Sequence, residues 1–70
     1  MEIIKIRDEY IKLGQAMKLA GLAEEGSEAK QMILNGEVEV NGAVEAQRGK
    51  KLYPGDTFSF DGQTFTVANE

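Results

Sequence analysis

The stretch from Ser27 to Gly42 reads SEAKQMILNGEVEVNG and predicts a helix followed directly by a β-hairpin. Ser27 is a good N-cap, because its hydroxyl can accept a hydrogen bond from an N–H group of the first helical turn. Apolar residues then recur at the spacing of one helical face, at Ala29, Met32 and Ile33. Asn35-Gly36 interrupts this pattern, so we expect the helix to end there.

The second part of the stretch predicts the hairpin. Residues 37–40 alternate glutamate with valine, which is the period of a half-buried strand. Asn41-Gly42 follows at once and favours a two-residue turn, because both residues tolerate a positive φ. We expect the chain to return on a partner strand that contains Val44 and Ala46.

Further elements are expected on both sides of this stretch. Upstream, the isoleucine-rich residues 2–7 predict a short strand, and residues 13–20 predict a short amphipathic helix. Downstream, residues 57–60 and 64–67 alternate in the same way around Asp61-Gly62, which predicts a second tight hairpin.

The predicted fold class is α+β, with two short helices packed on a small, mainly antiparallel sheet. A chain of 70 residues has room for one small domain, which we assign to residues 1–70. Helices this short are not stable alone in water, so both must pack against the sheet. The expected core consists of Ile3, Ile6, Leu13, Met17, Leu22, Ala29, Ile33, Val38, Val40, Phe58, Phe60 and Phe65.

The composition argues against several classes of function. The sequence has no histidine and no cysteine, so it lacks the commonest zinc ligands, the favourite general base and the thiolate nucleophile. We therefore expect no enzyme, no metal, no cofactor and no small-molecule substrate. The chain also lacks an apolar run of about 20 residues and a secretion signal, which predicts a cytoplasmic protein without a membrane partner.

Positive charge is concentrated in one segment of an acidic chain. The net charge is −4, yet Arg48, Lys50 and Lys51 lie between Ala46 and Gly55 with no acidic residue among them. Such a segment suits an anionic partner, and a solvated loop explains the charge equally well.

The first predicted helix and the two tyrosines carry weaker indications. Lys12, Gln15 and Lys18 repeat every third residue, which places ammonium and amide groups along one exposed stripe. Usually such a stripe is only solvated surface. Tyr10 and Tyr53 are candidates for stacking on nucleic-acid bases, but we expect both to pack in the core.

Taken in order, the motifs resemble the S4 RNA-binding domain family. The resemblance covers about residues 13–60 and is closest to the free-standing small bacterial proteins that consist of this domain alone. The motifs that carry it are LGQAMKLAGL at 13–22, AKQMI at 29–33, GEVEVNG at 36–42, RGKKL at 48–52 and PGDTF at 54–58.

This resemblance implies the alpha-L arrangement and an RNA-binding function. It implies a monomer that recognises structured RNA, such as ribosomal or transfer RNA, with ribosome association as one form of that role. The implied surface joins the exposed sides of the two helices to the basic loop. Its implied phosphate contacts are Lys18, Lys30, Arg48, Lys50 and Lys51, with Gln15, Ser27 and Gln31 as hydrogen-bonding groups and Gly49 as a point of close backbone approach.

The chain departs from the family pattern at two places. Lys12-Leu13-Gly14 stands where many members have Arg-Leu-Asp, and Gly26 stands where many have a basic residue. Two of the usual phosphate contacts are therefore weakened or absent. The alternative interpretation is a small protein-interaction module that works through its acidic face.

Overall fold

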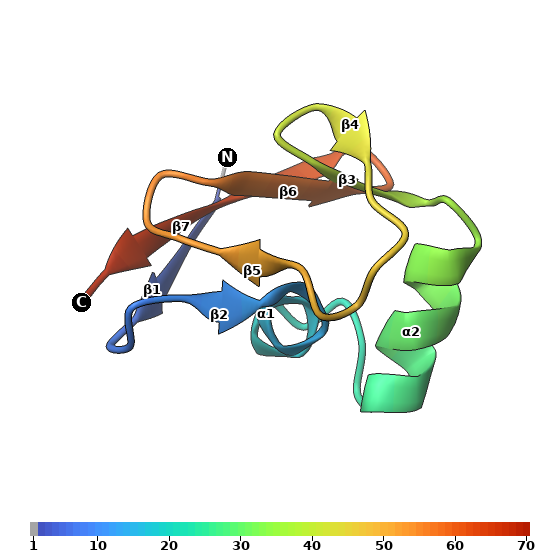
Figure 1. The fold of residues 1–70 in the computed structure, drawn as a ribbon, viewed down its shortest axis with the longest axis horizontal. Coiled ribbons are helices and arrows are strands. Elements are labelled where there is room, and N and C mark those ends of the chain that lie inside the picture. Colours follow the sequence, from blue (N-terminus) through green and yellow to red (C-terminus); the bar gives the residue numbers. More distant parts are fainter. Residues whose placement is uncertain (1) are drawn as a thin grey trace.

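The computed structural model describes residues 2–70 and confirms the α+β class (Figure 1). The main sheet contains β1 (Glu2–Ile6), β7 (Gln63–Asn69), β6 (Thr57–Phe60), β3 (Val38–Val40) and β4 (Ala43–Val44), in that spatial order. A separate two-stranded ribbon pairs β2 (Ile11–Lys12) with β5 (Lys51–Leu52). The helices are α1 (Leu13–Leu19) and α2 (Gly26–Leu34).

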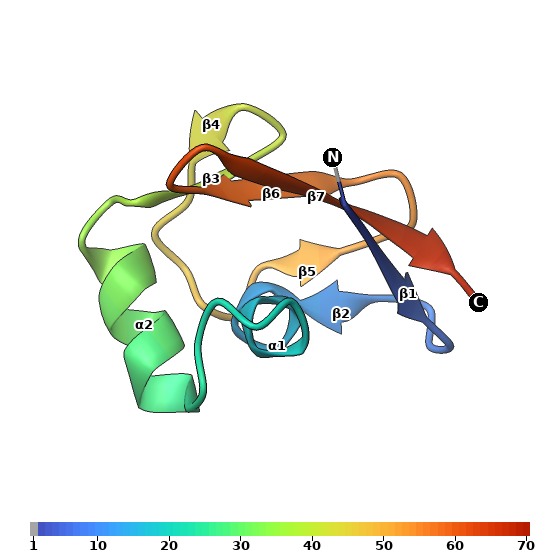
Figure 2. The same cartoon turned by 180° about the vertical axis from the view of Figure 1, so that it is seen from behind.

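The two ends of the described chain meet in the main sheet. Strand β1 pairs in parallel with β7, from Glu2 opposite Phe65 to Ile6 opposite Asn69. The other pairs in this sheet, β3 with β4, β3 with β6 and β6 with β7, are antiparallel. Seen from behind, β1 and β7 lie along one edge of the sheet, and α1 and the ribbon form a second layer facing it (Figure 2).

The two predicted hairpin turns are confirmed. Asn41 and Gly42 have φ values of 51° and 87°, and Asp61 and Gly62 have 51° and 80°. Each pair occupies the left-handed region that a two-residue hairpin turn requires. The return strand after the first turn is shorter than expected, because β4 ends at Val44 and leaves Ala46 outside the sheet.

The second helix begins two residues earlier than predicted, and its cap differs. Glu25 occupies the N-cap position and Ser27 lies inside the first turn, so the prediction of Ser27 as the cap was wrong. The Glu28 carboxylate reaches back and accepts a hydrogen bond from the Glu24 N–H at 2.6 Å. This bond fixes the residue before the cap, and no side chain among residues 2–70 caps the first-turn N–H groups of α2.

The core lies between the main sheet and the layer that holds the helices. Most of the predicted core is confirmed as buried: Ile6, Leu13, Met17, Ala29, Ile33, Val38, Val40, Phe58 and Phe65. Leu22 and Phe60 are only partly buried and pack against its edge. The Phe58 and Phe65 rings stack across β6 and β7 with centroids 5.1 Å apart.

The prediction of Ile3 as a core residue was wrong. Ile3 is 61% exposed, whereas Ile4 is only 8% exposed and packs with Ile6 in the core. Successive side chains of a strand point to opposite faces, so Ile4 and Ile6 share a face that Ile3 cannot reach. Neither helix in residues 2–70 is long and apolar enough to cross a membrane.

The neighbouring isoleucines of β1 provide a test of this strand's orientation. We expect Ile4→Ala to lower the free energy of unfolding by about 2–5 kcal/mol, because it leaves a cavity in the core. Ile3→Ala is the matched control and is expected to cost less than about 1 kcal/mol. Urea unfolding followed by circular dichroism measures both, and a larger loss for Ile3→Ala would contradict the observed register.

Candidate nucleic-acid interface

The N-terminus of α1 holds the segment that carries the positive charge. The Leu13 N–H donates to the Lys50 carbonyl at 2.8 Å, and the Gly14 N–H donates to the Arg48 carbonyl at 3.1 Å. First-turn N–H groups have no partner inside their own helix, so this pairing satisfies two of them. Residues 48–51, called the basic segment below, are therefore fixed against the start of α1.

Gly14 makes this close contact possible. A Cβ atom built at Gly14 would lie 2.6 Å from Arg48 Cγ and 3.2 Å from Arg48 Cδ. Any side chain at this position would therefore displace the arginine. The absence of a side chain at Gly14 thus leaves room for Arg48 against the start of α1.

An open groove of about 300 Å³ lies where α1, the start of α2 and the basic segment meet. Its lining, called the basic groove below, consists of Lys12, Gly14, Gln15, Lys18, Gly26, Arg48 and Gly49. Three of these residues are cationic and none is acidic. The Arg48 guanidinium also reaches toward α2, with one terminal nitrogen 3.9 Å from the position of a Cβ built at Gly26.

The groove brings together only part of the predicted site. Gln15, Lys18, Arg48 and Gly49 line it as one surface. The predicted residues on α2 are exposed but outside the lining: Ser27, Lys30 and Gln31. The Gln31 amide donates to Asn35 Oδ1 at 3.2 Å, within its own helix, so α2 contributes Gly26 to the groove rather than these polar side chains.

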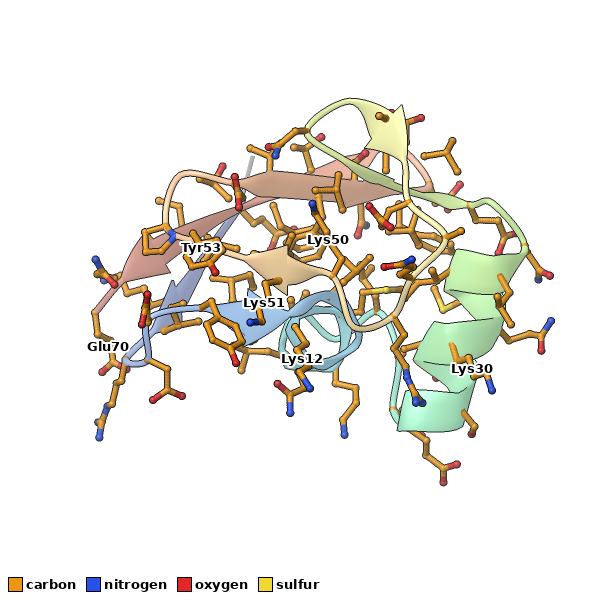
Figure 3. All side chains as sticks on the ribbon, in the orientation of Figure 1. Lys12, Lys30, Lys50, Lys51, Tyr53 and Glu70 are labelled. Atoms are coloured by element: carbon orange, nitrogen blue, oxygen red, sulfur yellow. The ribbon has the colours of Figure 1, made fainter. Side chains whose placement is uncertain are left out.

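Lys12 is a groove residue that the predicted site omitted. It lies directly opposite Lys51 in the β2–β5 ribbon, and the two lysines are labelled near each other in Figure 3. The signal in the sequence was the three-residue spacing that links Lys12 to Gln15 and Lys18. Like charges facing each other across two strands destabilise a ribbon, and a bound anion would relieve that repulsion.

Lys50 and Lys51 point in different directions. In Figure 3 the Lys50 side chain extends toward the main sheet, away from Lys12 and Lys51. Lys51 places its Nζ 4.8 Å from the centre of the Tyr10 ring. Of the two lysines, Lys51 is thus the one that adds its charge beside the basic groove.

The tyrosines lie outside the core, contrary to the prediction. Tyr53 is 42% exposed, and its ring centre lies 5.7 Å from that of Tyr10 at an angle of 49°. Tyr10 is half-buried at the start of the ribbon and does not belong to the core cluster. Its neighbours are Lys51 and Tyr53, so it lies beside the β2–β5 ribbon.

The positive charges of the groove are not neutralised within the described chain. The one ion pair among residues 2–70 joins Arg7 to Glu70 at 3.1 Å, at the ends of β1 and β7. Lys12, Lys18 and Arg48 therefore present their charges to whatever enters the groove. In the same residues, no cluster of histidine, cysteine, aspartate or glutamate side chains could hold a metal ion.

Comparison with known proteins assigns the family. The sequence model of a family described as S4 domain matches residues 4–68. A probable ribosome maturation protein of Bacillus subtilis (strain 168), RlbA, is 42% identical over 67 residues, which is 94% of each chain. A putative RNA-binding protein of Escherichia coli (strain K12), YbcJ, is 40% identical over 58 residues, which is 83% of each chain.

A solved structure agrees with the sequence comparison. The solution structure of YbcJ from E. coli, described as having an alpha-L motif involved in RNA-binding, superposes with a TM-score of 0.73 at 35% identity. The match covers 97% of this chain and 87% of that one. The chain therefore belongs to the S4 domain family.

Proposed function

We propose that this protein is a single-domain RNA-binding module, spanning residues 1–70, that recognises the backbone and shape of a structured RNA. The observation that carries the proposal is the basic groove, which gathers three cations and no carboxylate in a chain of net charge −4. Its relatives named as RNA-binding and ribosome maturation proteins support the same partner. Because one relative is named as a ribosome maturation protein, ribosomal RNA is the first RNA to test.

The chemistry of the groove suits phosphate. Lysine and arginine side chains that neutralise phosphates release condensed counterions, which supplies affinity that does not depend on sequence. Arg48 can also hold a phosphate through two parallel hydrogen bonds, whereas Lys12 and Lys18 act as point charges. The groove lining contains no aromatic ring on which a base could stack, so it suits the sugar-phosphate backbone of a helical RNA.

The α2 residues extend the proposed surface. Ser27, Lys30 and Gln31 are exposed on the helix whose first residue, Gly26, lines the groove. Together with Lys51, beside the groove, they would meet phosphates farther along the same RNA, and Lys50 would add a contact on the side of the main sheet. The acidic remainder of the chain repels RNA elsewhere and so favours one orientation of approach.

Reversing the charge of one groove residue tests this surface. We expect Arg48→Glu to weaken RNA binding at least about tenfold, because a charge-assisted contact is replaced by repulsion. Lys5→Glu makes the same change of charge on β1, outside the groove, and should leave binding near that of the parent. Fluorescence anisotropy with ribosomal RNA fragments measures both, and equal losses would show that only net charge matters.

Salt titration and a second variant separate this function from binding of a protein partner. For three to five neutralised phosphates, log K should fall against log salt with a slope of about −2 to −4.5, and Arg48→Glu should reduce that slope by about one. The double change Glu37→Lys and Glu39→Lys, on the exposed hairpin, should leave RNA binding unchanged or stronger. A protein-interaction module that works through its acidic face predicts the opposite pattern, with binding of its protein partner lost in this double variant and kept in Arg48→Glu.

The fit of Gly14 against Arg48 gives an independent prediction. Gly14→Ala should weaken RNA binding by up to about tenfold, because the added Cβ moves the arginine. The helix itself should not suffer, since alanine favours helix over glycine by roughly 0.5–1 kcal/mol. Leu34→Ala is the control, because Leu34 is exposed at the end of α2 and does not line the groove. Equal binding by both variants, measured by the same anisotropy titration, would remove the Gly14 contact from the mechanism.

A further inference from the structure

A second hollow adjoins the basic groove along α1 and shares two of its lining residues. It measures about 430 Å³, within the range of roughly 300–1,000 Å³ typical of small-ligand pockets. Gln15 and Lys18 line both the groove and this hollow, so the two are contiguous and one ligand could occupy both. We call it the side hollow, and its other lining residues in the argument are Asp8, Tyr10, Ile11 and Leu19.

The side hollow differs from the groove in its chemistry. It combines an aromatic ring with apolar side chains, and Leu19 in particular is 58% exposed. Its one carboxylate, Asp8, has no hydrogen-bond or ion-pair partner among residues 2–70. A phosphate would be repelled by this carboxylate, whereas the flat face of a nucleobase suits the ring and its N–H groups suit the Asp8 oxygens.

The Tyr10 ring is held in place from outside the hollow. Lys51 lies over the ring and Tyr53 packs against it, and neither residue lines the hollow. Figure 3 shows Lys51 and Tyr53 near each other beside the ribbon, which fits this supporting role. The ring is thus positioned before a ligand arrives, so a stacking partner need not order it.

We propose that the side hollow is a nucleobase subsite. An unpaired base of the bound RNA stacks on Tyr10 beside Leu19, and its flanking phosphate lies in the basic groove against Lys18. Guanine is the favoured base, because its N1–H and its amino group can donate together to the two oxygens of Asp8. This inference rests on the proposed function and adds to it an unpaired nucleotide next to the helical contact.

The composition of the chain supplies a direct reporter of this subsite. The sequence has two tyrosines and no tryptophan, so in Tyr53→Phe the tyrosine emission comes from Tyr10 alone. The probe is a hairpin RNA whose stem carries one unpaired guanosine, compared with the same hairpin carrying an abasic site at that position. We expect the guanosine RNA to quench Tyr10 emission and the abasic RNA to leave it unchanged.

Affinities complete the test. Removing the base should weaken binding by roughly 5- to 150-fold, the range that base–aromatic stacking provides. Tyr10→Leu should weaken binding of the guanosine RNA by the same factor and leave the affinity for the abasic RNA unchanged. Asp8→Asn should reduce the preference for guanosine over adenosine at that position, while stacking on the Tyr10 ring stays as it is.

The outcomes distinguish this subsite from the function on which it rests. Equal affinity for the guanosine and abasic RNAs, with no quenching of Tyr10, would overturn the subsite even if Arg48→Glu still weakens binding. Binding of both RNAs that Arg48→Glu leaves unchanged would overturn the basic groove and the subsite together. A loss on Tyr10→Leu that is the same for both RNAs would show that the ring only supports the fold, which also overturns the subsite.

Discussion

Two hydrogen bonds from the first turn of α1 to the basic segment determine the rest of the candidate site. The N–H groups of Leu13 and Gly14 meet the carbonyls of Lys50 and Arg48, residues far away in the sequence. The first N–H groups of a helix have no partner within the helix. The basic segment supplies carbonyl acceptors for two of them, and these bonds hold the segment in place. The β2–β5 ribbon continues the same contact, and Leu52 of β5 is fully buried beneath it. Without this junction, Arg48 would have no defined relation to Lys12 and Lys18.

The junction also concentrates charge at a cost to stability. Lys12 faces Lys51 across the ribbon, and neither has an acidic partner among residues 2–70. A fold selected only for stability would place opposite charges at such a pair. No acidic residue lines the basic groove, and Glu37 and Glu39 are exposed beside the first hairpin instead. We propose that this repulsion, which a bound phosphate would relieve, links the architecture to RNA binding.

The sequence patterns predicted individual turns and strands, but they did not predict contacts between residues that lie far apart in the chain. The turns at Asn41-Gly42 and Asp61-Gly62 were predictable because the residues themselves permit the required φ. The parallel pairing of β1 with β7 was not, because it joins the two ends of the described chain and decides which isoleucine faces the core. For the same reason, Gln15, Lys18, Arg48 and Gly49 were predicted as site residues, but the sequence did not show that they line one groove with Lys12 and Gly26. The polar residues of α2 were assigned to the site from the family pattern and lie outside the groove.

The most direct test of the basic groove is the change in backbone amide chemical shifts when a structured RNA is titrated into the protein. At 7.7 kDa the chain is small enough for every amide to be followed by NMR. If RNA occupies the basic groove, the largest shift changes fall on residues 12–18, Gly26 and the basic segment, where N–H groups of α1 donate to carbonyls of that segment. Changes confined to the β3–β4 hairpin around Glu39 and Val44, with the basic groove silent, would contradict it.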